Sequence, residues 1–424
     1  MIDKTIIKSL IVEYQQSVSE KKVMRRNHTF DEHSNYVLVG IRRAGKSFLL
    51  YQDIQDKIQE GKITEKGFVY INFEDERLAG IELQDLNMLL VCYNEMYSLD
   101  KPWVYLDEIQ NVEGWEKFAR RLVDQGYRVM ITGSNAKMLS GEIASRLGGR
   151  YISHEVYPFS FGEYLQYKGV EMKEGWQYDN RLQTKIRKMF DDYFLYGGFA
   201  ENFDRQDKRE WLNSLYQKIL LGDVIARNAI RNVGVFRLIA RKLADSVGQP
   251  MTQTRLQNIV RSMGENISLT VLRDYLEYMQ EAYLTFGLSN WTSSLSERSK
   301  MSKRYFMDNG LLNVFYMSSK GKMLENMVAI DLYKRYHLLD EVGVYYYNKN
   351  IEVDFCVPQE GWAVQTTLDL NDMETYERET RALGRFLKAN GEYKGIILSL
   401  DSEQEIEVEG RKVEVMPVWK WLLR

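Results

Sequence analysis

A glycine-rich segment near the start of the chain carries the strongest chemical signal in the sequence. Residues 40–47 match the pattern G-x-x-x-x-G-K-[ST] at every fixed position. In such a loop, glycines let backbone N–H groups surround phosphate oxygens, and the following helix adds its positive N-terminus. Lys46 is expected to reach the β- and γ-phosphates, and the Ser47 hydroxyl to bind Mg²⁺. The residues expected to bind the nucleotide are Gly40, Ile41, Arg42, Arg43, Ala44, Gly45, Lys46, Ser47 and Phe48.

A pair of adjacent acids follows a later apolar run. Asp107 and Glu108 come directly after residues 103–106, which lie far enough past Ser47 for one further strand and two helices. Asp107 suits a carboxylate that supports Mg²⁺, and Glu108 suits a base that holds and deprotonates the attacking water. The alternative is a pair of exposed acids at a strand end, which the glycine-rich loop disfavours.

Three polar side chains beyond these acids could also reach a nucleotide. Asn135 follows the next apolar strand, and its amide could position the water or contact the γ-phosphate. A turn or a helix N-cap is the alternative for Asn135. Either Arg146 or Arg150 could reach the nucleotide of a neighbouring chain as an arginine finger. A surface or salt-bridged arginine is the competing interpretation.

The elements that must position these residues alternate between strand and helix. Such alternation predicts an α/β fold with a parallel, doubly wound sheet. The strands are expected at residues 36–39, 67–73, 103–106 and 127–132, with helices at 46–60, 83–96 and 115–125. A further β-rich run, residues 151–157, ends at Pro158.

Two further patterns follow this alternating region. Residues 159–279 are mostly helical, and residues 303–424 change to an α-β-β-β-α-β order. In this last part helices are expected at 324–336 and 372–387, and strands at 344–347, 352–357, 362–367 and 395–400. The sequence therefore predicts three regions, at residues 1–158, 159–302 and 303–424.

Composition excludes several classes of protein. Of the 424 residues, 44% are hydrophobic and 28% charged, which is ordinary for a globular chain. Two cysteines and four histidines cannot form a Cys/His zinc cluster, and we expect a reducing, cytoplasmic compartment. No apolar run reaches the roughly 18 residues of a membrane span. A net charge of −3 means that any polyanion site must be a local patch.

Two basic segments could form such a patch. Residues 227–242 hold five positive charges and no acid, and residues 298–304 add Arg298, Lys300, Lys303 and Arg304. Between them, residues 269–276 are typical of a helix-turn-helix element. These features predict possible contact with duplex DNA through its phosphates. A solvated helical face or a protein-docking surface is the alternative.

The motifs together resemble a known family. Residues 37–47, 107–108, 132–135 and 148–150 are similar to prokaryotic AAA+-type P-loop ATPases of the archaeal-ATPase-like group, which carry a C-terminal domain of unknown function. The likeness continues through residues 73–77, 196–199, 308–311 and 324–326, and thus spans nearly the whole chain. The family usually has proline after Gly-Gly-Phe, where this chain has Ala200.

This resemblance implies a fold and several residue roles. It implies a P-loop core with an additional strand, a winged-helix-like middle and a restriction-endonuclease-like end. It also implies ATP as the nucleotide, Glu108 as catalytic base, Asn135 as sensor and Arg150 as arginine finger.

The last region departs from the pattern of a working nuclease. A PD-(D/E)XK nuclease needs a helix glutamate, a strand aspartate and a (D/E)-x-K motif on the next strand. Glu325 and Asp354 occupy the first two places, but the third reads Gln365-Thr366-Thr367. Glutamine is a poor Mg²⁺ ligand and Thr367 has no ammonium group, so nuclease activity is not expected. A binding or docking module is the favoured interpretation.

The sequence as a whole predicts a Mg²⁺-dependent AAA+ ATPase that couples ATP hydrolysis to a conformational change. An arginine finger would require a neighbouring chain, so a homo-oligomer or a partner-dependent assembly is expected. Two alternatives stay open, namely a nucleotide-gated switch with little turnover and a DNA-binding or DNA-processing ATPase.

Overall fold

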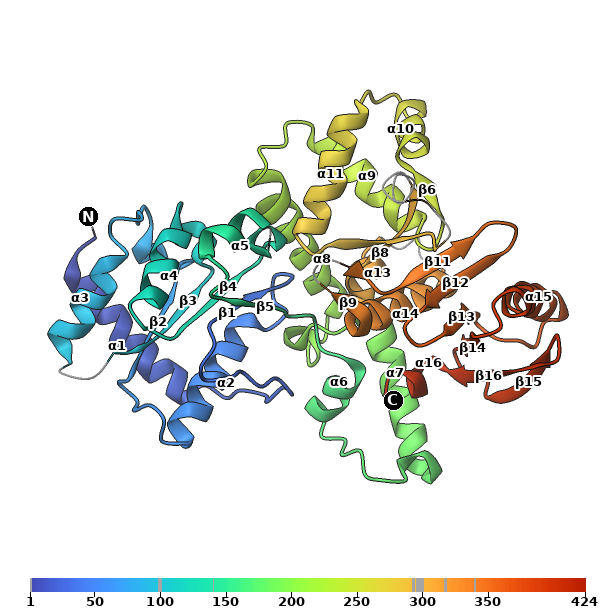
Figure 1. The fold of residues 1–424 in the computed structure, drawn as a ribbon, viewed down its shortest axis with the longest axis horizontal. Coiled ribbons are helices and arrows are strands. Elements are labelled where there is room, and N and C mark those ends of the chain that lie inside the picture. Colours follow the sequence, from blue (N-terminus) through green and yellow to red (C-terminus); the bar gives the residue numbers. More distant parts are fainter. Residues whose placement is uncertain are drawn as a thin grey trace. The chain divides into compact units, whose positions relative to one another are not determined.

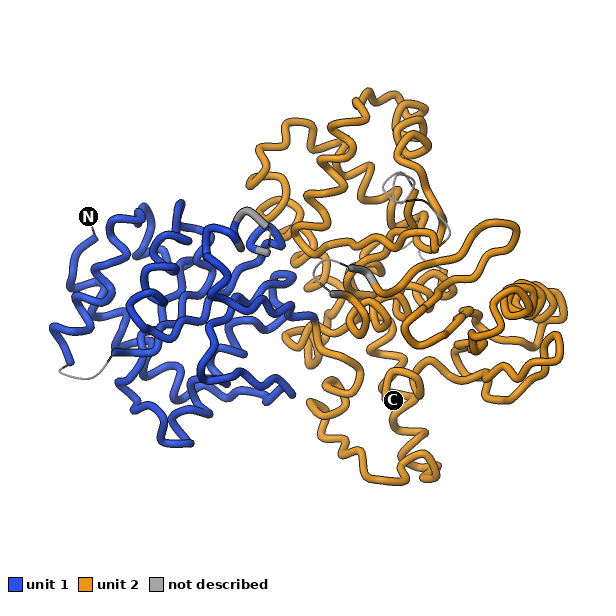
Figure 2. The backbone as a smooth tube through the Cα atoms, in the orientation of Figure 1, with its two compact units in different colours: residues 1–157 blue, residues 158–424 orange. Residues whose placement is uncertain are grey.

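The structure is a computed structural model that describes residues 2–97, 101–139, 141–291, 294, 301–315, 319–338 and 341–424. The chain forms two compact units, Met1–Tyr157 and Pro158–Arg424 (Figure 2). The predicted border between a second and a third region, at residue 302, falls inside the strand β8 (Met301–Phe306) of the second unit. The two units are described separately below.

The first unit is built on a five-stranded parallel sheet in the order β2-β3-β4-β1-β5 (Figure 1). Its strands are β1 (Tyr36–Val39), β2 (Phe68–Asn72), β3 (Trp103–Asp107), β4 (Val129–Gly133) and β5 (Ile152–Glu155). β1 and β4 are buried along their whole length, as expected for strands covered on both faces. The predicted parallel sheet is thereby confirmed. Because β4 lies between β1 and β3, the loops that follow these three strands meet at one edge of the sheet.

Helices complete the first unit. They are α1 (Lys4–Glu20), α2 (Lys46–Gln59), α3 (Asn87–Met96), α4 (Trp115–Asp124) and α5 (Gly141–Leu147), with short 3₁₀ turns η1 (Glu76–Leu78), η2 (Ile109–Asn111) and η3 (Ala136–Leu139). α1 was not predicted. It buries Ile7, Leu10, Ile11 and Val18, whose spacing places them on one helical face. The Gln15 side chain of α1 also donates a hydrogen bond to the Phe68 carbonyl of β2, at 2.8 Å.

The first half of the second unit is mostly helical, as the sequence predicted. Its helical elements are α6 (Phe161–Tyr167), η4 (Trp176–Tyr178), α7 (Asn180–Tyr196), η5 (Ala200–Asn202), α8 (Lys208–Lys218), the π-helical η6 (Ile219–Ala226), α9 (Val233–Asp245), α10 (Gln253–Ser262) and α11 (Leu269–Glu281). α9, α10 and α11 pack against a small antiparallel sheet of order β6-β8-β7. The other two strands of this sheet are β6 (Met251–Thr252) and β7 (Thr285–Ser289).

The second half contains a six-stranded mixed sheet in the order β11-β12-β13-β14-β16-β15. These strands are β11 (Tyr345–Asn348), β12 (Glu352–Val357), β13 (Trp362–Thr366), β14 (Lys394–Ser399), β15 (Gln404–Val408) and β16 (Arg411–Pro417). The remaining elements are α13 (Asn309–Asn313), α14 (Lys320–Tyr336), β9 (His337–Leu338), β10 (Glu341–Val342), α15 (Met373–Ala389) and α16 (Val418–Trp421). The predicted α-β-β-β-α-β order is confirmed, and the β15–β16 hairpin extends it.

The core of this sheet lies beneath α15. Leu383, Phe386 and Leu387 of α15 are buried against Val353 of β12 and Ile397 of β14. Figure 1 shows α15 beside the sheet strands β13 and β14. Among the helices of the described residues, none is long and apolar enough to cross a membrane.

A buried aspartate joins two loops within the second unit. The Asp308 carboxylate accepts hydrogen bonds from the backbone N–H groups of Gly198 and Gly310, both at 2.8 Å, and so caps α13. Gly197 has a φ of 73°, and a Cβ there would overlap this carboxylate. Glycine at residue 197 is therefore needed for the end of α7 to approach Asp308.

Candidate functional site

The glycine-rich loop connects the end of β1 to the start of α2, which begins at Lys46. Gly40 has a φ of 151°, and a Cβ on this residue would overlap the Val156 carbonyl oxygen. Gly45 also has a positive φ, of 99°, immediately before the helix. The two glycines therefore let the loop turn closely against the end of β5 and enter the helix, which places backbone N–H groups at a helix N-terminus.

The Lys46 side chain is buried inside the turn of this loop. Its Nζ donates hydrogen bonds to the carbonyl oxygens of Gly40, at 2.9 Å, and Ile41, at 3.1 Å. The same nitrogen lies 3.9 Å from Oε1 of Glu108. The lysine thus brings the loop after β1 and the acids after β3 to one place.

Asp107 is the last residue of β3 and is only 1% exposed. Its carboxylate accepts a hydrogen bond from the Thr132 hydroxyl and another from the Tyr70 hydroxyl, at 2.5 Å. Burial raises the pKa of Asp107, and the charge of Glu108 adds to this shift. Hydrogen bonds from Thr132, Tyr70 and Ser47 oppose the shift, so Ser47 lies beside Asp107.

Glu108 stands in a strained backbone conformation, with a φ of 54° and a ψ of 40°. Left-handed backbone is costly for a residue with a side chain and often occurs at functional sites. The backbone N–H of Glu108 donates to Oγ1 of Thr132 at 3.0 Å, and its carboxylate accepts from the Gln110 amide at 2.5 Å. Burial acts to raise the pKa of Glu108, but the charge of Lys46 and the Gln110 hydrogen bond outweigh it and the pKa is lowered. Glu108 is therefore a carboxylate at neutral pH.

The oxygen groups of this site fit a magnesium ion that also takes ligands from a nucleotide. Mg²⁺ is commonly bound through one or two carboxylates together with substrate phosphates. The Asp107 carboxylate and the Ser47 hydroxyl are the groups placed to hold it. Within the described part of the chain, no three His, Cys, Asp or Glu side chains are placed to hold a metal ion by themselves.

Asn135 lies next to this site but its side chain is engaged locally. Its Oδ1 accepts a hydrogen bond from the backbone N–H of Lys137, at 2.7 Å, at the start of η3. This is the turn-forming arrangement that the sequence left as the alternative. A role of Asn135 as a sensor stays a prediction.

The two candidate finger arginines pair with acids of α4. Arg146 lies 2.7 Å from Glu116, and Arg150 lies 2.6 Å from Asp124. Their side chains remain 53% and 34% exposed, respectively. Partly exposed ion pairs are weak, so both arginines could exchange their partners on assembly.

Three contributors to the site were not predicted. Tyr70 reaches Asp107 from β2, and Gln110 reaches Glu108 from η2. Arg26 precedes β1 and is 7% exposed; its guanidinium donates to the carbonyl oxygens of Ala44 and Tyr157, both at 3.1 Å. A tyrosine in an apolar strand and an arginine in an unpatterned segment give no sequence signal of a site. Gln110 is two residues from Glu108, and only this proximity could have indicated it.

Comparison with known proteins agrees with this geometry. Residues 32–165 match a family described as an AAA domain. The chain is also 32% identical to an uncharacterised protein of Methanocaldococcus jannaschii over 438 residues, which cover 100% of this chain and 96% of the relative. The chain belongs to the AAA-domain family. This membership and the phosphate loop together support ATP binding.

Other comparisons describe the rest of this AAA-domain protein. Residues 187–322 match a domain of unknown function, DUF8612, so the predicted resemblance is confirmed. A Haemophilus influenzae protein is 31% identical over 92% of this chain and 94% of its own length. A solved Walker-type ATPase of Pyrococcus abyssi is 15% identical, with a TM-score of 0.40 over 74% of this chain and 96% of its own. That structural likeness is too low to carry an argument.

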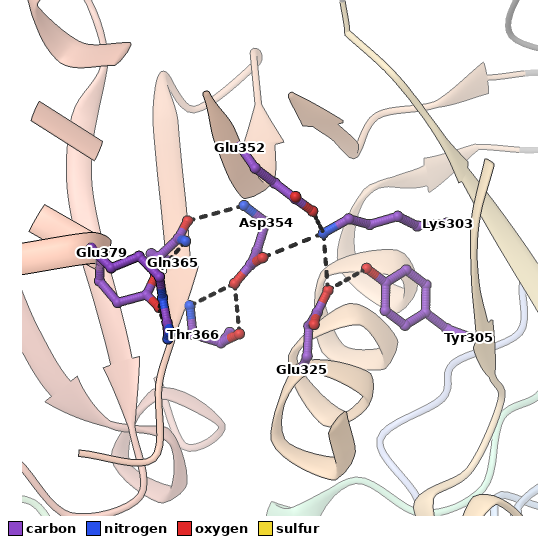
Figure 3. A network of polar contacts seen from close by, with 9 residues as sticks. Lys303, Tyr305, Glu325, Glu352, Asp354, Gln365, Thr366 and Glu379 are labelled. Carbon is purple, nitrogen blue, oxygen red and sulfur yellow. Dashed lines mark hydrogen bonds and ion pairs between the residues drawn. The ribbon is translucent and has the colours of Figure 1, made fainter. Parts of the chain in front are cut away.

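The second unit of the AAA-domain protein brings together the residues that were compared with a nuclease. Glu325 of α14 and Asp354 of β12 lie on either side of Lys303 of β8 (Figure 3). Gln365 does not replace an acid here: its Oε1 accepts from the Asp354 backbone, at 3.1 Å, and its amide donates to Glu379, at 2.5 Å. Thr367 donates its hydroxyl to the Asp369 carbonyl. The predicted lack of an ammonium at residue 367 holds, but Lys303 supplies one from another strand.

The position of Lys303 corrects one part of the predicted DNA-binding surface. Lys303 is 0% exposed and pairs with carboxylates, so it is not available to a phosphate backbone. Burial lowers the pKa of its neighbour Arg304 to about 10. Arg298 and Lys300 lie outside the described residues.

The other basic segment keeps exposed charges. Arg231, Arg237 and Arg241 are exposed on α9 and the turn before it. Arg227 lies 3.6 Å from Asp223, and Lys242 lies 2.5 Å from Asp245. Three exposed arginines outside these two ion pairs therefore remain from the five charges of this segment.

Proposed function

We propose that the chain hydrolyses ATP with Mg²⁺ and couples hydrolysis to a conformational change. The observation that carries this proposal is the convergence of Lys46, at the start of α2, with Asp107 and Glu108, at the end of β3. The family, the loop and the acids support the binding of a nucleotide, and the carboxylate state of Glu108 supports the chemical step.

Each residue has a role that follows from its charge and position. The backbone N–H groups of residues 40–47 and the Lys46 ammonium bind the phosphates and stabilise the charge that develops on them. Ser47 and Asp107 hold Mg²⁺, which supplies electrostatic stabilisation when bound. Glu108 accepts the proton of the attacking water, and its strained backbone fixes where the carboxylate points.

Arg150 is proposed to act on the nucleotide of a neighbouring copy of the chain. Within one chain its guanidinium is used by Asp124 in a partly exposed ion pair, which assembly could exchange for a phosphate. Activity would then require an oligomer or a partner-dependent assembly.

The test is phosphate release from ATP by the purified chain, titrated over protein concentration with Mg²⁺ and compared with Glu108→Gln. The proposal expects turnover that rises faster than linearly and a Glu108→Gln variant that binds ATP without turnover. Turnover that persists in Glu108→Gln would remove the proposed base. Tight ATP binding without turnover at any concentration would contradict the hydrolytic mechanism and leave a nucleotide-gated switch.

That switch is the second candidate function, because Glu108 is already hydrogen-bonded by Gln110. This bond occupies one oxygen of the carboxylate, Oε2, and so restrains the proposed base. Replacement of Gln110 by alanine separates the two functions: a true switch stays without turnover, whereas a restrained ATPase gains it.

Contact with duplex DNA is proposed only for the exposed arginines of α9 and the turn before it. Three arginines on one segment provide the sequence-independent charge that phosphate contacts need.

A further inference from the structure

A single ammonium group lies at the meeting point of three carboxylates in the second unit (Figure 3). Lys303 Nζ is 2.9 Å from Oε1 of Glu352, 3.2 Å from Oε1 of Glu325 and 3.3 Å from Oδ1 of Asp354. We refer to these four residues as the Lys303 centre. The lysine is 0% exposed, and the Glu352 side chain is 45% exposed, against 15% for Glu325 and 12% for Asp354, so the centre reaches solvent mainly on the Glu352 side.

Three separate elements deliver these groups. Alternation along β8 places Lys303 and Tyr305 on the same face of the strand, and both contact the Glu325 carboxylate of α14. Glu352 and Asp354 follow the same alternation on β12. A Cβ on Gly248, which has a φ of 77°, would overlap the Glu325 carboxylate, so glycine is required for this approach.

The three carboxylates of the Lys303 centre surround one cation, the Lys303 ammonium. An ammonium has three N–H donors, and three carboxylate oxygens surround this one, so its donors are fully used. Three carboxylates repel each other unless a cation lies among them. Lys303 is the only positive side chain among the four residues of the centre.

Neighbouring bonds fix the direction in which Asp354 points. Its Oδ2 accepts from the backbone N–H of Thr366, at 2.9 Å, and from the Thr366 hydroxyl, at 2.7 Å. Only Oδ1 therefore faces the lysine. Gln365 binds the Asp354 backbone and Glu379, so the neutral residue in the third nuclease position is used for orientation and is not aimed at the cation.

We propose that the Lys303 ammonium is the resident cation of this centre and that it excludes divalent metal ions, which would enter only if the lysine were removed. Without the lysine, the site would bind a divalent cation that prefers oxygen ligands, such as Mn²⁺ or Mg²⁺. The carboxylate oxygens stand 2.9 to 3.3 Å from Nζ, and Mg²⁺, which takes oxygen ligands at about 2.1 Å, would draw them inward by about 1 Å. The exposed Glu352 side chain has room to make that movement.

The experiment measures Mn²⁺ bound by the full, nucleotide-free chain, using the electron paramagnetic resonance signal of free Mn²⁺. Wild type is compared with Lys303→Met, which keeps the apolar stem and removes the charge, and with Lys303→Met/Asp354→Asn. The nucleotide site of the first unit is identical in all three and cancels in the difference. We expect Lys303→Met to bind one more Mn²⁺ per chain than wild type, to gain thermal stability from Mn²⁺, and to lose both effects in the double variant.

The stability of Lys303→Met and the behaviour of the wild type provide two further tests of the proposal. Removal of one partner from a buried ion pair is strongly destabilising, so Lys303→Met that folds only with Mn²⁺ would also support the proposal. A variant that folds without binding Mn²⁺, or that stays unfolded with it, would overturn the proposal. Mn²⁺ binding or DNA cleavage by the wild type that disappears in Asp354→Asn would overturn it as well. None of these readouts depends on ATP turnover.

Discussion

The Thr132 hydroxyl donates a hydrogen bond to the Asp107 carboxylate across the neighbouring strands β4 and β3. The same oxygen accepts the backbone N–H of Glu108, at 3.0 Å. One side chain therefore fixes both the acid proposed to hold Mg²⁺ and the residue proposed as the base. The relative positions of these two acids depend on a residue that touches neither water nor nucleotide in our proposal.

The first prediction concerns this hydroxyl. Thr132→Val keeps the side-chain shape but removes a hydrogen bond to a charged group, worth about 2 kcal/mol. We expect kcat for ATP hydrolysis to fall about tenfold to a hundredfold, which corresponds to about 1.4 to 2.7 kcal/mol. Thr132→Ser retains the hydroxyl and is the matched control. Equal activity of the two variants, measured by steady-state phosphate release, would show that the hydroxyl is dispensable.

The second prediction concerns the start of the phosphate loop. Gly40→Ala adds a Cβ that would overlap the Val156 carbonyl, whereas Gly61→Ala, at a φ of 71° instead of 151°, adds a Cβ with nothing near it. Left-handed strain alone costs about 1 kcal/mol. We expect Gly61→Ala to lower the free energy of unfolding by that amount, and Gly40→Ala to lower it by about 3 kcal/mol or more. Denaturant unfolding of both variants tests the difference, and equal losses would contradict the overlap.

The third prediction tests whether Arg150 acts between chains. Arg150→Ala is expected to lower ATP turnover about a thousandfold or more, as for loss of an arginine finger. Mixing it with Glu108→Gln should restore part of the activity, because an intact base and an intact arginine then meet at a shared site. Asp124→Asn removes the acid that pairs with Arg150 within the chain and should leave turnover unchanged. Arg146→Ala, carried through the same mixing assay, decides between the two arginines.

The fourth prediction concerns pH. Burial raises the pKa of Asp308 to about 6, and hydrogen bonds from backbone N–H groups oppose this shift. The pKa of Asp308 in the folded state lies above its unfolded value of 3.8. The contribution of Asp308 to stability is therefore fully present below pH 3.8 and is lost as pH rises through about 6. Relative to Asp308→Asn, wild type should lose up to about 3 kcal/mol between about pH 4 and pH 7.

Urea unfolding of the wild type and Asp308→Asn across this range measures the difference. Asp372, the exposed N-cap of α15, is the control, since hydrogen bonds from Thr375 lower its pKa. Its contribution should stay constant between about pH 4 and pH 7 and be lost only as pH falls below 3.8, which is the opposite direction. A pH-independent difference for Asp308→Asn would show that the carboxyl does not titrate in this window.

The fifth prediction concerns DNA. Replacement of Arg231, Arg237 and Arg241 by glutamine should weaken binding to duplex DNA by about tenfold or more and reduce its salt dependence. Replacement of Arg381, Arg385 and Lys388, which are exposed on α15, removes the same charge elsewhere. Fluorescence anisotropy at several salt concentrations compares the variants. Absence of wild-type binding at low salt, or equal loss in the control, would end the DNA hypothesis.

Much of the first unit could be predicted because its signals are local. The phosphate loop is a contiguous motif, and Asp107 and Glu108 follow an apolar strand directly. Parallel strands buried on both faces give continuous apolar runs, so β1, β3 and β4 were predicted from composition. α1 lies outside these motifs and was missed, although the helical spacing of Ile7, Leu10 and Ile11 could have indicated it.

Prediction from local sequence signals fails at Lys303 in the second unit. Lys303 was assigned to a basic surface because its neighbours in sequence are basic. Its actual partners, Glu325, Glu352 and Asp354, lie on α14 and β12, and only the tertiary fold brings the lysine to them. Charge in a sequence window cannot distinguish a solvated lysine from one buried among acids.

Gly40 and Arg26 have a mechanical consequence for the first unit. The start of the phosphate loop packs on the Val156 carbonyl, and Arg26 joins the Ala44 carbonyl in the same loop to the carbonyl of Tyr157. Val156 and Tyr157 are the last residues before the chain passes into the second unit. A displacement of the loop on phosphate binding would therefore pull directly on the exit strand of the first unit, with no intervening helix to absorb the motion.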